Sequence, residues 1–402
     1  MREYFHKLTT GKTPWEISLL FSLAICLLFS QISISIVQIF LTLALLSWLL
    51  LLLQKKRRLA FPSFFWPLLV YAWLSLVASI YSVNTEMSFK DSRELLLYVL
   101  ILIVFTAFTR RDDIELLFVA LLSSGLINTA YSIAYFIFKA DPGQRVKGFM
   151  GHYMTQAGLL TLFGAVAMGF IFLGRGRQRL LWAAGLVLSS IALILTLTRS
   201  GWIGLAVALC VSLLLWKPKT LILVPVRAGL VVVVSPKPVK DRALSIFSLR
   251  EFSNMARVEY IHAGIKIIKD FPWLGTGPDT VDMVFQNPKY GLEESYKRNV
   301  HLHNNMIQIA AERGIATLLA WLTFVVTAFV SLARLVKKRA KGLLAPAAGA
   351  LAALAAFIAA GFFEYNFGDS EVSTLLLFII TIPFALERLK NGEAAAAQNA
   401  SQ

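Results

Sequence analysis

The chain is dominated by apolar runs long enough to cross a membrane, separated by short polar segments. A helix that crosses a bilayer needs about 17 to 25 consecutive apolar residues, and about twelve such runs recur. They are expected at residues 15–33, 35–53, 63–81, 94–109, 115–138, 155–173, 180–197, 201–216, 220–235, 314–334, 343–363 and 372–387. Helices satisfy every backbone group within lipid, so the pattern predicts an all-α polytopic membrane protein.

Composition narrows the class of protein further. Hydrophobic residues make up 57% of the 402 residues and charged residues 15%, against about a quarter charged in soluble proteins. The net charge of +16 does not indicate nucleic acid, because the basic residues form short clusters between apolar runs, which fits anionic membrane lipids. Cys26 and Cys210 lie inside apolar runs without metal-ligand spacing, so neither a disulfide framework nor a metal site is expected.

The basic clusters predict the orientation. The richer set of loops holds Arg2, Lys7, Lys12, Lys55, Lys56, Arg57, Arg58, Arg110, Arg111, Arg175, Arg177, Arg179, Lys217, Lys219, Arg334, Lys337, Lys338, Arg339, Lys341, Arg388 and Lys390. The short loops on the other side hold only Lys90, Arg93, Lys139, Arg145, Lys147 and Arg199. The positive-inside rule therefore places both termini in the cytoplasm.

One long polar loop divides the chain. The expected parts are nine spans in 1–235, a large outer loop in 236–302, three spans in 303–388 and a disordered cytoplasmic tail in 389–402. Within the loop, residues 254–269 have helical periodicity, with Val258, Ile261, Ile265 and Ile268 on one face. We expect the loop to lie back over the spans as a lid or cavity wall.

A pair of histidines lies where this loop meets the next apolar helix. An imidazole titrates near neutral pH and can take a proton from a hydroxyl. If a helix starts near His303, then His303 shares a face with Gly314, whereas His301 points elsewhere. Asn304 is suited to cap the helix or to bind a polar ligand. An interfacial histidine satisfied by backbone groups is the alternative.

Two arginines stand in unusual surroundings. Arg199 follows a tight break between two apolar runs. Either it reaches out to lipid phosphates or its fork of donors binds an anion in a cavity, most naturally phosphate. Arg257 lies on the expected loop helix, where a solvated helix face is the simpler interpretation.

Other cationic groups share the outer side. Lys90, Arg93, Arg145, Lys147 and His152 would make it a focus of positive potential, although each could be an ordinary loop charge. The sequence has no Asp-x-Asp motif, Gly-rich phosphate loop or Walker lysine, which disfavours nucleotide sugars and ATP. An anionic substrate held near the outer headgroups is the simple consequence.

The motifs resemble those of the O-antigen ligase and polymerase superfamily. That family has a His-Asn start, nine residues, Gly, two residues and then Gly, Thr or Tyr, which is matched by His303-Asn304, Gly314 and Thr317. The turn around Arg199 looks like the family's arginine turn. Arg257 and residues 272–277 resemble the start of its large periplasmic loop. The motifs cover about residues 140–335.

The resemblance implies a GT-C-like glycosyltransferase of the bacterial inner membrane with a periplasmic active site. Such ligases move a glycan from undecaprenyl diphosphate to a sugar hydroxyl of lipid A-core, with inversion and without metal or cofactor. By the resemblance, His303 is the general base, while Arg199 and Arg257 bind the diphosphate. Secondary candidates are Asn304, His301, Arg145, Lys147, His152 and Arg93.

Three other functions are weighed. A polymerase of the same superfamily would extend a lipid-linked repeat, and the His-Asn match favours a ligase modestly. A protein oligosaccharyltransferase typically carries more C-terminal soluble sequence than is expected here. A transporter could share the predicted layout, but ionisable residues cluster at one face rather than near the midplane.

Overall fold

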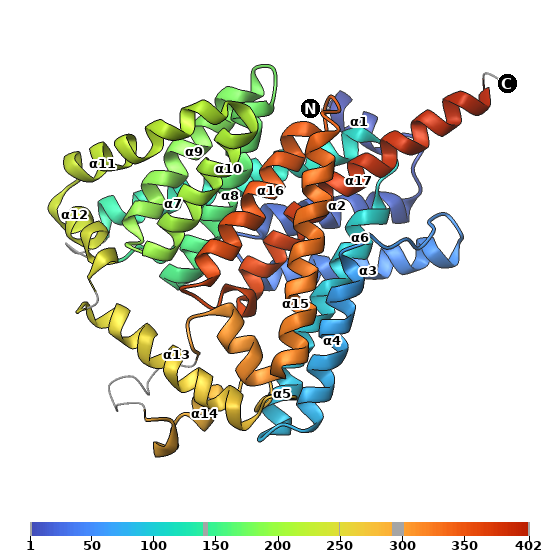
Figure 1. Ribbon diagram of the computed structural model, residues 1–402. Coiled ribbons are helices and arrows are strands. Elements are labelled where there is room, and N and C mark those ends of the chain that lie inside the picture. Colours follow the sequence, from blue (N-terminus) through green and yellow to red (C-terminus); the bar gives the residue numbers. More distant parts are fainter. Residues whose placement is uncertain (1, 140–143, 249, 292–300, 401–402) are drawn as a thin grey trace.

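The computed structural model describes residues 2–139, 144–248, 250–291 and 301–400, and every regular element in these ranges is a helix (Figure 1). The helices are α1 (Arg2–Thr9), α2 (Pro14–Phe29), α3 (Ile34–Leu53), α4 (Phe65–Ile80), α5 (Thr85–Asp91), η1 (Ser92–Tyr98), α6 (Val99–Ala107), α7 (Arg111–Phe138), α8 (Tyr153–Leu173), α9 (Gln178–Leu195), α10 (Arg199–Trp216), η2 (Pro218–Leu223), α11 (Val224–Val234), α12 (Lys237–Leu244), η3 (Ser245–Phe247), α13 (Phe252–Asp270), α14 (Val281–Val284), η4 (Pro288–Tyr290), α15 (Asn305–Lys337), α16 (Leu344–Gly361), η5 (Asn366–Gly368) and α17 (Ser370–Ala400). The all-α class is confirmed.

Among the described residues, eight helices are long and apolar enough to cross a membrane, namely α3, α7, α8, α9, α10, α15, α16 and α17, with α2 and α4 as shorter apolar helices. The chain is therefore a multi-pass membrane protein. The twelve expected spans are not seen in the described residues. The run 94–109 divides into a 3-10 turn and the short α6, and the run 220–235 divides into η2 and α11. In the second run Pro225, which cannot donate a helical hydrogen bond, stands at the start of α11.

The centre of the bundle is built from α8, α16 and α17. In the apolar stretches of these helices 72%, 78% and 83% of the residues are buried, whereas the share is only 28% in α3 and in α9. Small residues allow these central helices to pack tightly, because helices in lipid associate by close backbone approach. A Cβ on Gly169 would lie 2.5 Å from the backbone nitrogen of Gly349. Helix α17 continues to Ala400 through the stretch expected to be a disordered tail, which is rich in the strong helix former alanine.

Many of the basic loops meet at one end of the bundle. Ion pairs join Lys7 to Asp112 and Lys338 to Glu387, and Arg388 donates to the carbonyl of Phe105. Both ends of the chain lie there, at the upper side of Figure 1, whereas α13, α14 and α5 lie at the lower side. The charge pattern of the sequence thus identifies loops that share one end.

The described part of the expected large loop contains the 19-residue helix α13 and the shorter helices α12 and α14. Residues 249 and 292–300 of that loop are outside the described residues. The helical periodicity of residues 254–269 is confirmed by α13, but this helix buries a different face from the one that carries the apolar stripe. Its buried residues are Ala256, Tyr260, Ala263, Gly264 and Ile267, while Val258 and Ile265 are 41% and 40% exposed.

The reason for the different face is that side chains at the start of α15 pack directly on the backbone of α13. A Cβ on Gly264 would lie 2.3 Å from the Cγ2 atom of Ile307 on α15. The face with small residues therefore lies against α15, because bulky aliphatic side chains there would hold the helices apart.

Gly314 creates a kink in α15 that the neighbouring loop fills. Its φ is +82°, and a Cβ there would lie 1.9 Å from the carbonyl oxygen of Trp273. The Ile315 nitrogen donates to the carbonyl of Pro272 over 2.9 Å, and the Thr276 nitrogen donates to that of Ala311 over 2.9 Å. The loop thus satisfies backbone groups that the kink frees, so only glycine fits at this position.

Candidate active site

Two histidines converge on one carboxylate at the lip of the bundle. The Nδ1 atom of His303 lies 3.0 Å from Oε2 of Glu364, and the Nε2 atom of His301 lies 3.5 Å from Oε1. The two imidazole rings are 4.3 Å apart. The expectation that His301 points elsewhere is therefore wrong. Helix α15 starts only at Asn305, and His303 precedes it with a left-handed φ of +50°, which brings both rings to the same side.

Asparagines fasten this segment to the loop after α16. Asn304 caps α15, as expected, because its Oδ1 accepts from the nitrogens of Met306 and Ile307. Its Nδ2 donates to the carbonyl of Phe362 over 3.0 Å. Asn305 donates to Asn366 over 2.7 Å. The histidines are therefore held against Glu364 by the helix start itself.

The charges of this group follow from burial and contact. Burial alone would raise the pKa of Glu364, but His303, His301 and Arg257 outweigh it and lower the pKa to about 2. Burial lowers the pKa of His301 to about 4. Glu364 is thus ionised and His301 neutral at neutral pH. Since an ionised carboxylate only accepts, His303 donates from Nδ1.

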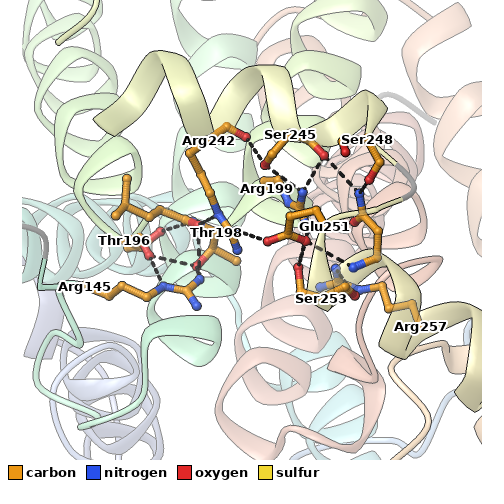
Figure 2. Close-up of polar contacts among 12 residues, drawn as sticks. Arg145, Thr196, Thr198, Arg199, Arg242, Ser245, Ser248, Glu251, Ser253 and Arg257 are labelled. Atoms are coloured by element: carbon orange, nitrogen blue, oxygen red, sulfur yellow. Dashed lines mark hydrogen bonds and ion pairs between the residues drawn. The ribbon is translucent and has the colours of Figure 1, made fainter. Parts of the chain in front are cut away.

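A second group, the arginine cluster, gathers cationic side chains from separate segments of the chain (Figure 2). It consists of Arg145, Arg199, Arg242 and Arg257. Arg199 follows a turn with a left-handed Leu197 and is only 5% exposed. One arm donates to the carbonyl of Ser245 over 2.8 Å. The other arm donates to Glu251 over 3.0 Å, and also to Ser253 and Asn254.

Arg242 and Arg145 complete the positive surroundings. Arg242 pairs with Glu251 over 2.7 Å. Arg145 donates to the carbonyl of Thr196 over 2.9 Å and lies 3.5 Å above the ring of Tyr153. Burial and the neighbouring arginines lower the pKa of Arg145 to about 10, so it remains charged at neutral pH. Within the described residues, Glu251 is the carboxylate paired with two of the four arginines, which leaves the cluster with excess positive charge.

Arg257 joins the two groups. Its Nε donates to the carbonyl of Phe363 over 3.0 Å, immediately before Glu364 in the chain, and its Nη1 donates to the carbonyl of Ser253 over 3.3 Å. Arg199 also donates to Ser253, so Arg257 borders both the cluster and the His303–Glu364 pair. The three main residues expected from the sequence therefore lie in one site.

The remaining candidates lie at the edges. His152 is exposed, and its Nδ1 lies 3.3 Å from Oγ1 of Thr155. Burial of its ring, with Arg145 and Lys147 nearby, lowers the pKa of His152. Lys147 is exposed, and Arg93 is exposed on η1, where it joins neither group.

Sequence reasoning missed Glu364, Arg242 and Glu251. Glu364 carried a signal, because it stands between the last two apolar runs on the same side as the histidines. Arg242 and Glu251 carried no signal that separates them from other loop charges.

The His301, His303 and Glu364 ligand atoms lie within 4.8 Å of one another, so within the described residues this group could hold a metal ion. Two imidazoles and a carboxylate suit zinc-like cations. The same distances fit a hydrogen-bonded base and its orienting carboxylate. The expectation of a reaction without metal stays a prediction.

The comparisons with known proteins address the identity of this region. No curated protein matches the chain. Residues 184–322 match the family model Wzy_C, described as O-Antigen ligase. The matched range contains Arg199, Arg242, Arg257 and His303 but neither Arg145 nor Glu364. The resemblance seen in the motifs is confirmed over residues 184–322, where the chain matches this family model.

Proposed function

We propose that the protein is an O-antigen ligase. It transfers a glycan from undecaprenyl diphosphate to a sugar hydroxyl of lipid A-core at the periplasmic face of the bacterial inner membrane. The observation that carries this proposal is Arg257, whose contacts join a cluster of four arginines to the buried pair of His303 and Glu364. An anion site and a base at one location are what transfer from a diphosphate donor requires.

The arginine cluster serves the donor. A diphosphate leaving group develops negative charge as its bond to the sugar breaks, and preorganised cations stabilise that charge. Arginine forks match phosphate oxygens in geometry. The incoming diphosphate would compete with Glu251 for Arg199 and Arg242, which that carboxylate now pairs with. Because arginines supply the charge, the proposed transfer needs no metal.

His303 serves the acceptor. Its Nε2 takes the proton of the acceptor hydroxyl while that oxygen attacks the anomeric carbon of the donor sugar. The bond from that carbon to the diphosphate breaks, and the electron pair leaves with the diphosphate. A single displacement of this kind inverts the anomeric configuration. Glu364 keeps Nδ1 protonated and stabilises the imidazolium that forms.

The orientation is inferred from charge. The basic loops gather at the end opposite α13, and such loops face the cytoplasm in bacterial membrane proteins. The site therefore faces the periplasm, and both termini face the cytoplasm.

A transfer assay with inserted variants tests this function. His303→Ala should lower the rate by about 10²- to 10⁴-fold, the usual share of a general base. Arg199→Ala should lower it by about a hundredfold, the usual cost of one charge-stabilising contact. Arg93→Ala, an exposed arginine outside both groups, is the matched control. Normal rates in both His303→Ala and Arg199→Ala would overturn the assignment. Transfer onto lipid-linked repeat instead of core lipid would identify a polymerase.

A further inference from the structure

Glu364 also lines a small pocket. Its volume is about 200 Å³, and its walls include His152, Met154, His301, Glu364, Tyr365 and Asp369. These residues come from the start of α8, the segment before α15 and the loop before α17. His152 is exposed at the rim, so the pocket reaches the surface. The carboxylate that orients His303 thus also forms part of the pocket wall.

The wall is held rigidly before any ligand arrives. Tyr365 accepts a hydrogen bond from Arg313 over 3.1 Å, and Arg313 is fixed by ion pairs with Asp91 and Glu312. Asp369 accepts from the hydroxyl of Thr155 over 2.5 Å. A preorganised wall of this kind lowers the entropy lost when a ligand binds.

The charge of the pocket is opposite to that of the arginine cluster. Among its lining residues in the described part of the chain there is no lysine or arginine, while Glu364 and Asp369 are both acidic. Burial and a hydrogen bond with Glu371 raise the pKa of Asp369. Sugar hydroxyls can donate to the carboxyl oxygens of Glu364 and Asp369, whereas a phosphate would meet two acidic side chains and no lysine or arginine among the described lining residues.

We propose that this pocket holds the terminal sugar of the acceptor and selects a sugar that carries neither phosphate nor carboxylate. The inference rests on the proposed function. The arginine cluster then takes the anionic leaving group, and the pocket, which His301 and Glu364 line beside His303, takes the neutral nucleophile. The two sites sort donor from acceptor by charge.

The test compares two acceptors that differ only in a phosphate on the terminal hexose. With purified full-length protein and a lipid-linked glycan donor, the neutral acceptor should have a KM at least about tenfold lower, as expected when a buried group stays paired. Met154→Trp fills the pocket and should raise the acceptor KM about tenfold, while the donor KM stays within about twofold. Met283→Trp, on the exposed face of α14, should change neither constant.

A second measurement needs no catalysis. Adding the neutral acceptor alone should raise the thermal unfolding midpoint of the wild type and of Met283→Trp, but not that of Met154→Trp. If Met154→Trp does not fold, Asp369→Ala is measured in its place. A rise in the donor KM instead of the acceptor KM, or equal use of both acceptors, would overturn the inference and leave the proposed function standing. Absence of transfer by the wild type to either acceptor would overturn both.

Discussion

Replacing Glu364 by glutamine tests how the base is organised. The change keeps the shape of a side chain 3.0 Å from Nδ1 of His303 but removes its charge. The lowering of the Glu364 pKa from 4.5 to about 2 corresponds to about 3 kcal/mol of preferential interaction with the ionised carboxylate. If the transition state, with an imidazolium at His303, loses that interaction, the rate falls by about a hundredfold.

The assay is steady-state glycan transfer by purified protein, with both substrates varied. We expect kcat of Glu364→Gln to fall by about a hundredfold while the donor KM stays unchanged, because the arginine cluster is untouched. Glu86→Gln, at an exposed glutamate of α5, should match the wild type. A folded Glu364→Gln protein with wild-type kcat, or one that changes only the donor KM, would refute the role of Glu364 as the group that orients His303.

Three further predictions concern the kink, the arginine cluster and acid stability. Gly314→Ala should destabilise the protein by about 4 kcal/mol or more, seen as a lower unfolding midpoint, because its Cβ would lie 1.9 Å from a carbonyl oxygen; Gly392→Ala, with open space around it, is the control. Arg242→Gln should raise the donor KM about tenfold, whereas the control Arg93→Gln should leave it unchanged. A donor KM of Arg242→Gln equal to that of the wild type would show that Arg242 does not belong to the donor site. The pKa of His301 is 6.5 in the unfolded chain and about 4 in the folded protein, so between these values the unfolded chain binds the proton more strongly. Stability should therefore fall as the pH is lowered from about 6.5 to about 4. In His301→Asn this part of the fall should be absent, and an unchanged pH profile would contradict the assignment.

Most of the membrane helices could be predicted from the sequence because local hydrophobicity decides them. The run 94–109 and the run 220–235 could not, since their hydropathy suits a span but their backbones form 3-10 turns and short helices. The face of α13 could not be predicted either. Apolar periodicity selects Val258 and Ile265, but the close approach to α15 selects Ala263 and Gly264.

The site divides in a similar way. His303, Arg199 and Arg257 could be found because each lies in a local motif with a chemical reason behind it. Glu364 is paired with His303 only through the folding of the loop after α16 onto the start of α15. His301 lies in the site because the backbone of His303 is left-handed. A helical projection of the sequence does not represent such a turn.

The most direct test of the account is transfer by the purified protein with undecaprenyl diphosphate glycan, a defined lipid A-core acceptor and a metal chelator. We expect product whose new glycosidic bond has the anomeric configuration opposite to that of the donor, at a rate that the chelator does not change. Retained configuration, or a rate abolished by chelation and restored by a divalent metal, would contradict a single displacement driven by His303 and the arginine cluster.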